Sequence, residues 1–172
     1  MPRSGIYSAE GGSVRSGGHT ATHQSGLCAF WLAGRCFGLD VGAVGEVVAL
    51  DAITRVPNAR RAIRGIFNLR GTPLVVLDLG DILELGGGDQ PTGKVGLILR
   101  RGELVAAAEV DRVESVIPPG RGELAPRGDG EHPAVLGLLD DRASGGRIVT
   151  VLDPELLFER LQALRYITDH DD

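Results

Sequence analysis

The sequence predicts an all-β fold with short helices, in which two small β units pack together and one helix follows at the C-terminus. Many short apolar runs are separated by glycine turns, which is typical of barrels rather than of a parallel sheet with crossover helices. A layout of hairpin plus helical segment also occurs twice. With 172 residues, 42% of them hydrophobic, the chain can bury one sizeable core.

Residues 1–25 are expected to form a disordered tail, because they are mostly Gly, Ser, Thr, Ala and His and have little apolar surface to bury. His19 and His23 would share one face of a helix. Gly17 and Gly18 disfavour that helix, however, and no Cys or carboxylate joins the two histidines. We interpret the pair as incidental and expect no metal site.

The ordered domain is expected to span residues 26–166 and to open with a hairpin of two apolar runs, 27–32 and 36–39, about a glycine turn. Cys28 and Cys36 flank this turn. Neither disulfide geometry nor an oxidising compartment is indicated, so we interpret them as buried free thiols.

The first subdomain is expected to cover about residues 26–85 and the second about residues 94–152, and both consist of short strands and hairpins. The remaining elements expected in the first are a helical turn capped by Asp40, strands at 47–50 and 54–56, a hairpin over 65–77 and a brief helix at 79–85. Those expected in the second are a hairpin over 94–110, a strand at 113–117, a loop at 118–133 and a hairpin over 136–152.

The glycine-rich segment 86–91 separates the two halves, and we interpret it as a linker. A phosphate-binding loop would need a helix N-terminus after it, whereas a β-type run from Lys94 follows here. Each half ends its last hairpin with the same three residue types, Val-Leu-Asp, at 76–78 and at 151–153. Because each unit is too small to bury a good core alone, we expect the two to pack together.

The C-terminal helix is predicted over residues 154–165. Asp153 can accept hydrogen bonds from the first free amides, and Pro154 suits the first helical turn. The leucines at helical spacing are expected to close the core. They are Leu156, Leu157, Leu161 and Leu164.

Composition excludes several classes of function. The net charge of −5 disfavours nucleic acid as a partner, and no apolar stretch approaches the length needed for membrane insertion, so a cytoplasmic protein is expected. The histidines lie in the tail, a loop and the terminus, which leaves no catalytic constellation and no cofactor site. Asp78 and Asp153 could be proposed as a catalytic pair, but helix capping explains both.

Several segments together resemble the CheW-like domain family, and the resemblance covers roughly residues 27–164. The Gly-Ile-Phe-Asn-Leu-Arg-Gly run is the most specific of them. The matching segments are 65–71, 74–79, 37–40, 44–47, 54–57 and 110–116.

The resemblance implies two SH3-like five-stranded barrels, no catalysis and an adaptor role. The implied partners are the cytoplasmic tip of a chemoreceptor and the regulatory domain of a CheA-like histidine kinase, with recruitment to receptor arrays. The alternative is a scaffold of a non-flagellar chemosensory system, for gliding, pilus or developmental signalling, which binds the kinase but not a receptor.

Arg70 is the strongest candidate binding residue, since a guanidinium at a hairpin turn can make a planar, multidentate contact. We expect it to pair with Glu46, whose carboxylate should face away from the apolar side of its strand. The alternative for Arg70 is a merely solvated turn residue. Val44 and Ile66 form either an exposed groove or part of the core. The candidate protein-binding residues are Val44, Glu46, Gly65, Ile66, Asn68, Arg70 and Gly71.

Overall fold

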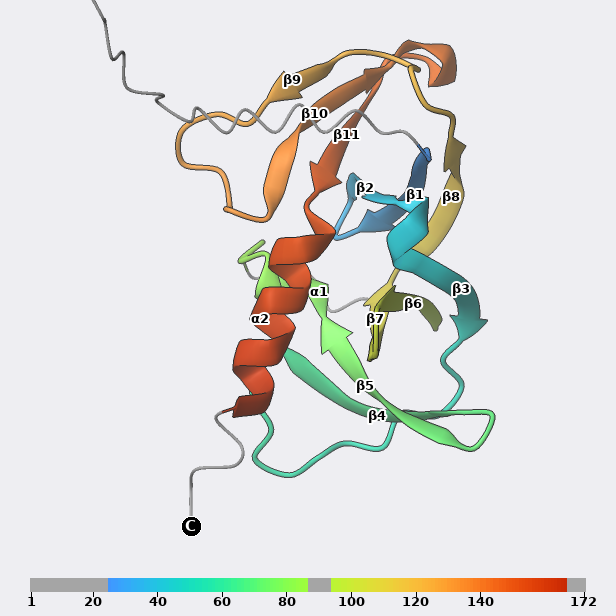
Figure 1. Cartoon of the computed structure of the whole chain (residues 1–172), viewed down its shortest axis with the longest axis vertical. Helices are drawn as coiled ribbons and strands as arrows, with labels where there is room; N and C mark the ends of the chain where they lie inside the picture. The colour runs from blue at the N-terminus through green and yellow to red at the C-terminus, as the bar shows by residue number, and fades with distance from the viewer. Residues whose placement is uncertain (1–24, 87–93, 167–172) are drawn as a thin grey trace, which may run out of the picture.

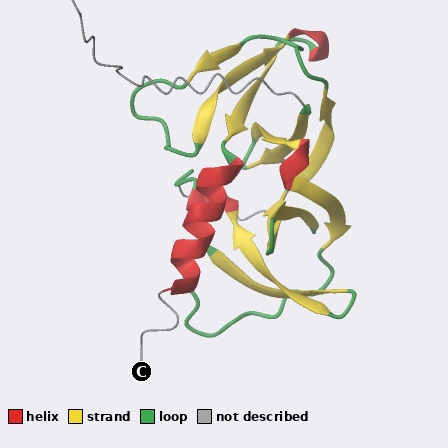
Figure 2. Cartoon of the chain, in the orientation of Figure 1, coloured by secondary structure: helices red, strands yellow, loops and turns green. Residues whose placement is uncertain are grey.

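The computed structural model describes residues 25–86 and 94–166. Two β-sheets lie one above the other, and a single long helix packs along one side of the molecule (Figure 1). Strands dominate the rest of the chain, and the other helical segments are short (Figure 2). The predicted all-β fold with two packed units and a C-terminal helix is confirmed.

The terminal sheet contains strands from both ends of the described chain, in the order β8-β1-β2-β11-β10-β9. Only β2 and β11 pair in parallel, through Thr150 with Phe37 and Val151 with Gly38. The strands are β1 (Leu27–Leu32), β2 (Arg35–Asp40), β8 (Arg112–Ile117), β9 (Leu124–Pro126), β10 (Val135–Asp141) and β11 (Arg147–Leu152).

The central sheet contains strands from the middle of the chain, in the order β3-β6-β7-β5-β4. Here β5 and β7 are the parallel pair, with Val76 opposite Ala107. The strands are β3 (Val44–Ala49), β4 (Ile63–Leu69), β5 (Thr72–Asp78), β6 (Val95–Arg101) and β7 (Leu104–Val110).

The predicted boundaries of the subdomains, 26–85 and 94–152, are wrong, because each sheet takes strands from both halves. The opening hairpin β1–β2 joins the C-terminal strands rather than β3 to β5. The chain crosses between sheets at a 3-10 turn, Val41–Ala43, and again between β7 and β8. The repeated hairpins were visible in the sequence, but a parallel contact between distant segments leaves no local signal.

The two sheets nevertheless match strand for strand, so that β3-β6-β7-β5-β4 corresponds to β8-β1-β2-β11-β10. Both contain one parallel pair, and the outer hairpin of each has a register shift before the same position, Gly65 in β4 and Gly137 in β10. Beyond these hairpins, β9 pairs with β10 in the terminal sheet, with Pro126 opposite Gly137. At the corresponding edge of the central sheet there is a single bridge, between Thr54 and Ile66. The segment 54–56 is therefore not the strand that was predicted.

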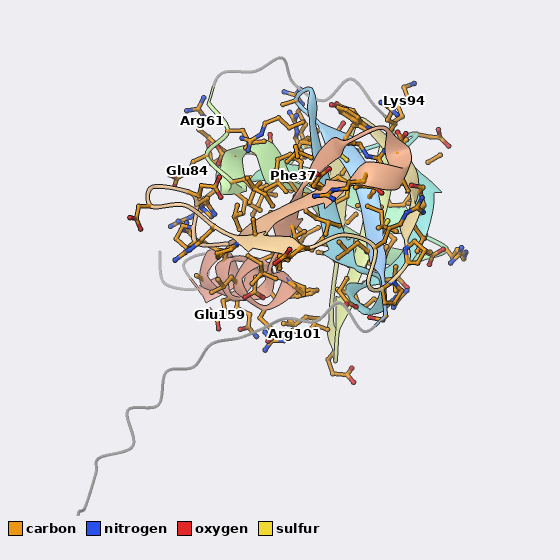
Figure 3. The ribbon with its side chains drawn as sticks, turned by 90° about the horizontal axis from the view of Figure 1, so that it is seen from above. Phe37, Arg61, Glu84, Lys94, Arg101 and Glu159 are labelled. Carbon is orange, nitrogen blue, oxygen red and sulfur yellow. The ribbon has the colours of Figure 1, made fainter. Side chains whose placement is uncertain are left out.

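Three apolar clusters hold the fold together. The largest lies between the sheets and includes Phe30 and Phe37, whose stacked rings are 5.9 Å apart between centroids. Phe37 lies inside the molecule, whereas Arg61 and Lys94 lie at its periphery (Figure 3). Each sheet also has a smaller cluster on its own concave side, around Val149 in the terminal sheet and Ile98 in the central sheet.

The two helices begin as the sequence predicts. Asp78 accepts from the Asp81 N–H at 3.0 Å ahead of α1 (Leu79–Ile82), and Asp153 accepts from the Glu155 N–H at 2.9 Å ahead of α2 (Pro154–Tyr166). In α2, the predicted Leu157 and Leu161 are buried in the largest cluster and Leu156 packs against it. Phe158 is a fourth contact that the leucine pattern did not include.

Cys28 and Cys36 are free and buried, as predicted. They belong to different clusters, Cys28 between the sheets and Cys36 in the terminal sheet, and burial raises the pKa of both thiols. The predicted tail with its two histidines, and all but one residue of the segment interpreted as a linker, lie outside the described residues.

Candidate protein-binding site

Glu46 lies on β3, an outer strand of the central sheet that pairs only with β6. A bulge at Gly45 shifts the register, so that Val44 is opposite Leu99 but Glu46 is opposite Ile98. Glu46 therefore shares the concave face of the sheet with Ile98. The expectation that its carboxylate faces away from the apolar side is wrong, because the bulge changes which residues share a face.

Arg70 is the first residue of the two-residue turn between β4 and β5. Arg70 and Gly71 have φ values of 50° and 89°, the left-handed conformations that a tight hairpin turn requires. Asn68 stabilises the turn because its Oδ1 accepts from the Gly71 N–H at 2.6 Å. Gly or Asn is the usual residue at the position of Arg70, so an arginine there carries a conformational cost.

Arg70 and Glu46 form a bidentate ion pair, as the sequence predicted. Nη1 of Arg70 donates to Oε1 of Glu46 at 3.1 Å, and Nη2 donates to Oε2 at 2.7 Å. Because β3 and β4 are the two outermost strands of the central sheet, this pair connects opposite edges of one curled sheet. We call it the edge clasp. The Arg70 side chain remains 72% exposed, so its remaining N–H groups face solvent.

A second arginine, Arg100 on β6, lies beside the edge clasp with its Nη2 3.6 Å from Oε1 of Glu46. The hydrogen bond from Arg70 lowers the pKa of Glu46 below its usual range, and the charge of Arg100 acts in the same direction. Gly45 leaves room for this arrangement, since a Cβ there would lie 2.5 Å from Nε of Arg100. The sequence prediction missed Arg100 because its proximity depends on the pairing of β3 with β6.

The apolar candidates separate into two roles. Val44 is half-buried and packs against the cluster between the sheets, whereas Ile66 is 38% exposed. Val47, which the prediction did not include among the binding residues, is 50% exposed on β3. Gly65 has a structural role: a Cβ there would lie 2.3 Å from the carbonyl oxygen of Thr54, which bridges to Ile66.

The structure thus brings Glu46, Asn68, Arg70 and Gly71 together at one corner of the central sheet, where charged groups are exposed and fixed. A fixed, partly exposed guanidinium with free donors is suited to recognising a protein surface.

In the described residues, no helix is long and apolar enough to cross a membrane.

The chain belongs to the CheW-like domain family, whose model matches residues 27–162. It is 31% identical over 88 residues to the chemotaxis protein CheW of Klebsiella aerogenes, an alignment that covers 51% of this chain and 53% of that protein. The match therefore spans about half the length of that relative. The crystal structure of the scaffolding protein TtCheW from Thermoanaerobacter tengcongensis is similar, with a TM-score of 0.62 and 29% identity over 76% of this chain and 89% of that one.

Proposed function

We propose that this protein is a non-enzymatic adaptor in the cytoplasm that couples the cytoplasmic tip of a chemoreceptor to the regulatory domain of a CheA-type histidine kinase. Membership of the CheW-like family and the likeness to a scaffolding protein support this role. The two carboxylates that could have been taken for a catalytic pair, Asp78 and Asp153, cap helices instead.

The observation that carries the proposal is the conformation of Arg70. An arginine occupies a left-handed turn position where glycine would be less strained, and its guanidinium is both exposed and hydrogen-bonded through two nitrogens to Glu46. Folding stability does not account for this choice, since exposed ion pairs add little to it. Presentation of a preorganised guanidinium to a partner does account for it.

The first prediction is that Arg70→Ala weakens binding by about tenfold or more, because a desolvated arginine contact is a common binding hot spot. Its melting temperature should fall by about 2 °C or less, because the lost ion pair is exposed. Isothermal titration calorimetry with the purified receptor tip and the purified kinase regulatory domain, alongside thermal melts, measures both effects.

Arg142→Ala is the matched control, since Arg142 is 88% exposed in the corresponding connection between β10 and β11 and pairs with Asp140. Arg70→Gly removes the guanidinium while relieving the turn, so it should bind as weakly as Arg70→Ala and melt no lower than the native chain. A folded Arg70→Ala protein with native affinity for both partners would refute the role proposed for Arg70.

The same titrations separate the adaptor from the alternative scaffold. An adaptor binds the receptor tip and the kinase domain, each alone and both together. A scaffold of a non-flagellar system would bind the kinase domain and leave the receptor tip unbound.

A further inference from the structure

The parallel pair in the central sheet is formed over only part of its length. The ladder between β5 and β7 runs from Val76 opposite Ala107 to Asp78 opposite Glu109. The preceding residues, 72–75 in β5 and 104–106 in β7, pair on their outer sides with β4 and β6 but not with each other. Within the described chain, these two facing backbone edges have no ladder partner.

A cavity of about 450 Å³ lies where the two strands separate, and we call it the β5–β7 slot. Its lining comes from both faces of the sheet: Leu74 and Val105 belong to the cluster on the concave side, whereas Val75 and Leu161 of α2 belong with the cluster between the sheets. Residues from both faces can line one cavity only where the wall of the sheet is open. The slot is therefore an opening between strands.

The rim of the β5–β7 slot is rich in hydrogen-bond donors. Arg70 and Arg100 both line it, together with the single carboxylate of Glu103. Their side chains are 72% and 48% exposed, and Glu46 engages only part of their donor capacity. A carboxylate entering beside the slot would meet two guanidinium groups.

The chemistry of the slot selects the shape of its occupant. A helix has already satisfied its own backbone groups and is about 10 Å wide, so it could not use the free strand edges. An extended segment can pair with the free backbone groups of both edges, except that Pro73 in β5 offers only its carbonyl, while an apolar side chain enters the cavity, which is the principle of strand addition.

We propose that the β5–β7 slot binds an extended peptide segment of a partner protein, with an apolar side chain in the cavity and a neighbouring carboxylate at Arg70 and Arg100. The slot deepens the proposed function, because it adds a backbone-binding groove beside the edge clasp. The existence of the slot does not depend on which partner supplies the segment.

The direct test uses an acetylated and amidated Asp-Val-Thr-Val-Asp peptide as the probe, and the same peptide with Lys in place of Asp as its control. Titration into the full-length chain, followed by backbone amide chemical shifts, should move the signals of residues 72, 74 and 75 in β5 and of 104–106 in β7, since Pro73 has no amide proton. The Lys peptide should bind at least about tenfold more weakly. If the Asp peptide shifts no amides in these two segments at millimolar concentration, the slot is not a peptide site.

Two variants block the slot at different depths. Val105→Trp fills the slot from its half-buried wall, and Thr72→Trp narrows it from its exposed rim. Because Thr72 is exposed, the second variant still tests the slot if the first fails to fold. Ile148→Trp is the control, since Ile148 is 52% exposed on β11, the counterpart of β5. Blocked chains should lose the peptide-induced shifts, while the control keeps them. Unchanged shifts in a folded Thr72→Trp protein would overturn the assignment.

Hydrogen exchange with the receptor tip and the kinase domain connects the slot to the proposed function. Slowed exchange at 104–106 on addition of either protein is expected. If both proteins bind and exchange there is unchanged with each of them, the slot does not serve that function. If neither protein binds at all but the peptide does, the proposed function fails and the slot stands.

Discussion

The outer strands β3 and β8 of the two sheets both have a bulge with a carboxylate at or next to it, but the two carboxylates have different partners. In the central sheet, Gly45 is the bulged residue of β3 and the next residue, Glu46, reaches the exposed Arg70. In the terminal sheet, the bulged residue of β8 is itself acidic, Glu114, and it accepts from Trp31 Nε1 at 2.8 Å. Both carboxylates have a lowered pKa, but that of Glu114 is lowered first by the indole hydrogen bond.

The arginine partners of the two carboxylates differ in how exposed they are. Arg147 contacts Glu114 at 3.1 Å and Asp141 at 2.9 Å, and only 13% of its side chain is exposed. Arg70 is 72% exposed. Glu114 thus has one largely buried arginine partner beside the exposed Arg112, whereas both arginines beside Glu46 are exposed.

Largely buried arginines also occupy different positions in the two sheets. In the central sheet, Nε of Arg64 lies 3.3 Å from Asp78 and 3.0 Å from Glu109, and all three side chains are less than one fifth exposed. The matching register in the terminal sheet places Leu136 at the position of Arg64. At this position the central sheet therefore has an arginine between two carboxylates, whereas the largely buried arginine of the terminal sheet, Arg147, lies on β11.

Arg64→Leu, which copies the terminal sheet, should produce the largest loss of stability. It leaves the carboxylates of Asp78 and Glu109 together without their shared cation, and the free energy of unfolding should fall by about 3 kcal/mol at neutral pH. Urea denaturation measures the change. Adding Glu109→Gln to Arg64→Leu should recover part of it, whereas no recovery would show that repulsion between carboxylates is not the cause.

The two bulge glycines allow the next comparison. A Cβ at Gly137 would lie 2.1 Å from the carbonyl oxygen of Ala125, and one at Gly65 would lie 2.3 Å from that of Thr54. Gly65 alone also has a positive φ, 152°.

Alanine at either bulge glycine should separate the neighbouring segment from its sheet. Gly65→Ala should cost about 2 kcal/mol, and Gly137→Ala about 1 kcal/mol less, because only the first adds backbone strain to the collision. Hydrogen exchange should increase at Thr54 and Ile66 in the first variant and at β9 in the second. Equal costs in urea would contradict the contribution of the strained φ at Gly65.

The sequence was sufficient for features that depend on neighbouring residues. Glycine turns between apolar runs located the hairpins, and Asp78 and Asp153 could be recognised as caps because capping involves residues only two or three positions apart. The pairing of Arg70 with Glu46 was also predicted.

Apart from the Arg70–Glu46 pair, features that depend on contacts between distant segments could not be predicted from the sequence. The exchange of strands between halves follows from the parallel pairs, and the proximity of Arg100 to Glu46 follows from the β3–β6 register. β9 was missed inside a loop rich in Pro and Gly, since three residues are too few to give an alternating pattern.

The smallest predicted effect concerns the pH dependence of stability. Each sheet has one largely buried carboxyl with a shifted pKa, and the two pKa values shift in opposite directions. Burial raises the pKa of Glu109 in the central sheet, whereas hydrogen bonds from Ser144 and then Arg147 lower that of Asp141 in the terminal sheet. A raised carboxyl pKa costs stability as pH rises through the unfolded value of about 4.3, and a lowered one adds stability above about 3.9. Glu109→Gln should therefore equal or exceed the native chain at pH 7, while Asp141→Asn should be less stable there by about 1 kcal/mol. Urea denaturation from pH 3 to pH 7 should show both differences shrinking at the acid end. Parallel curves for the native chain and Asp141→Asn across that range would show that the ionised form of Asp141 contributes nothing to the stability of the terminal sheet.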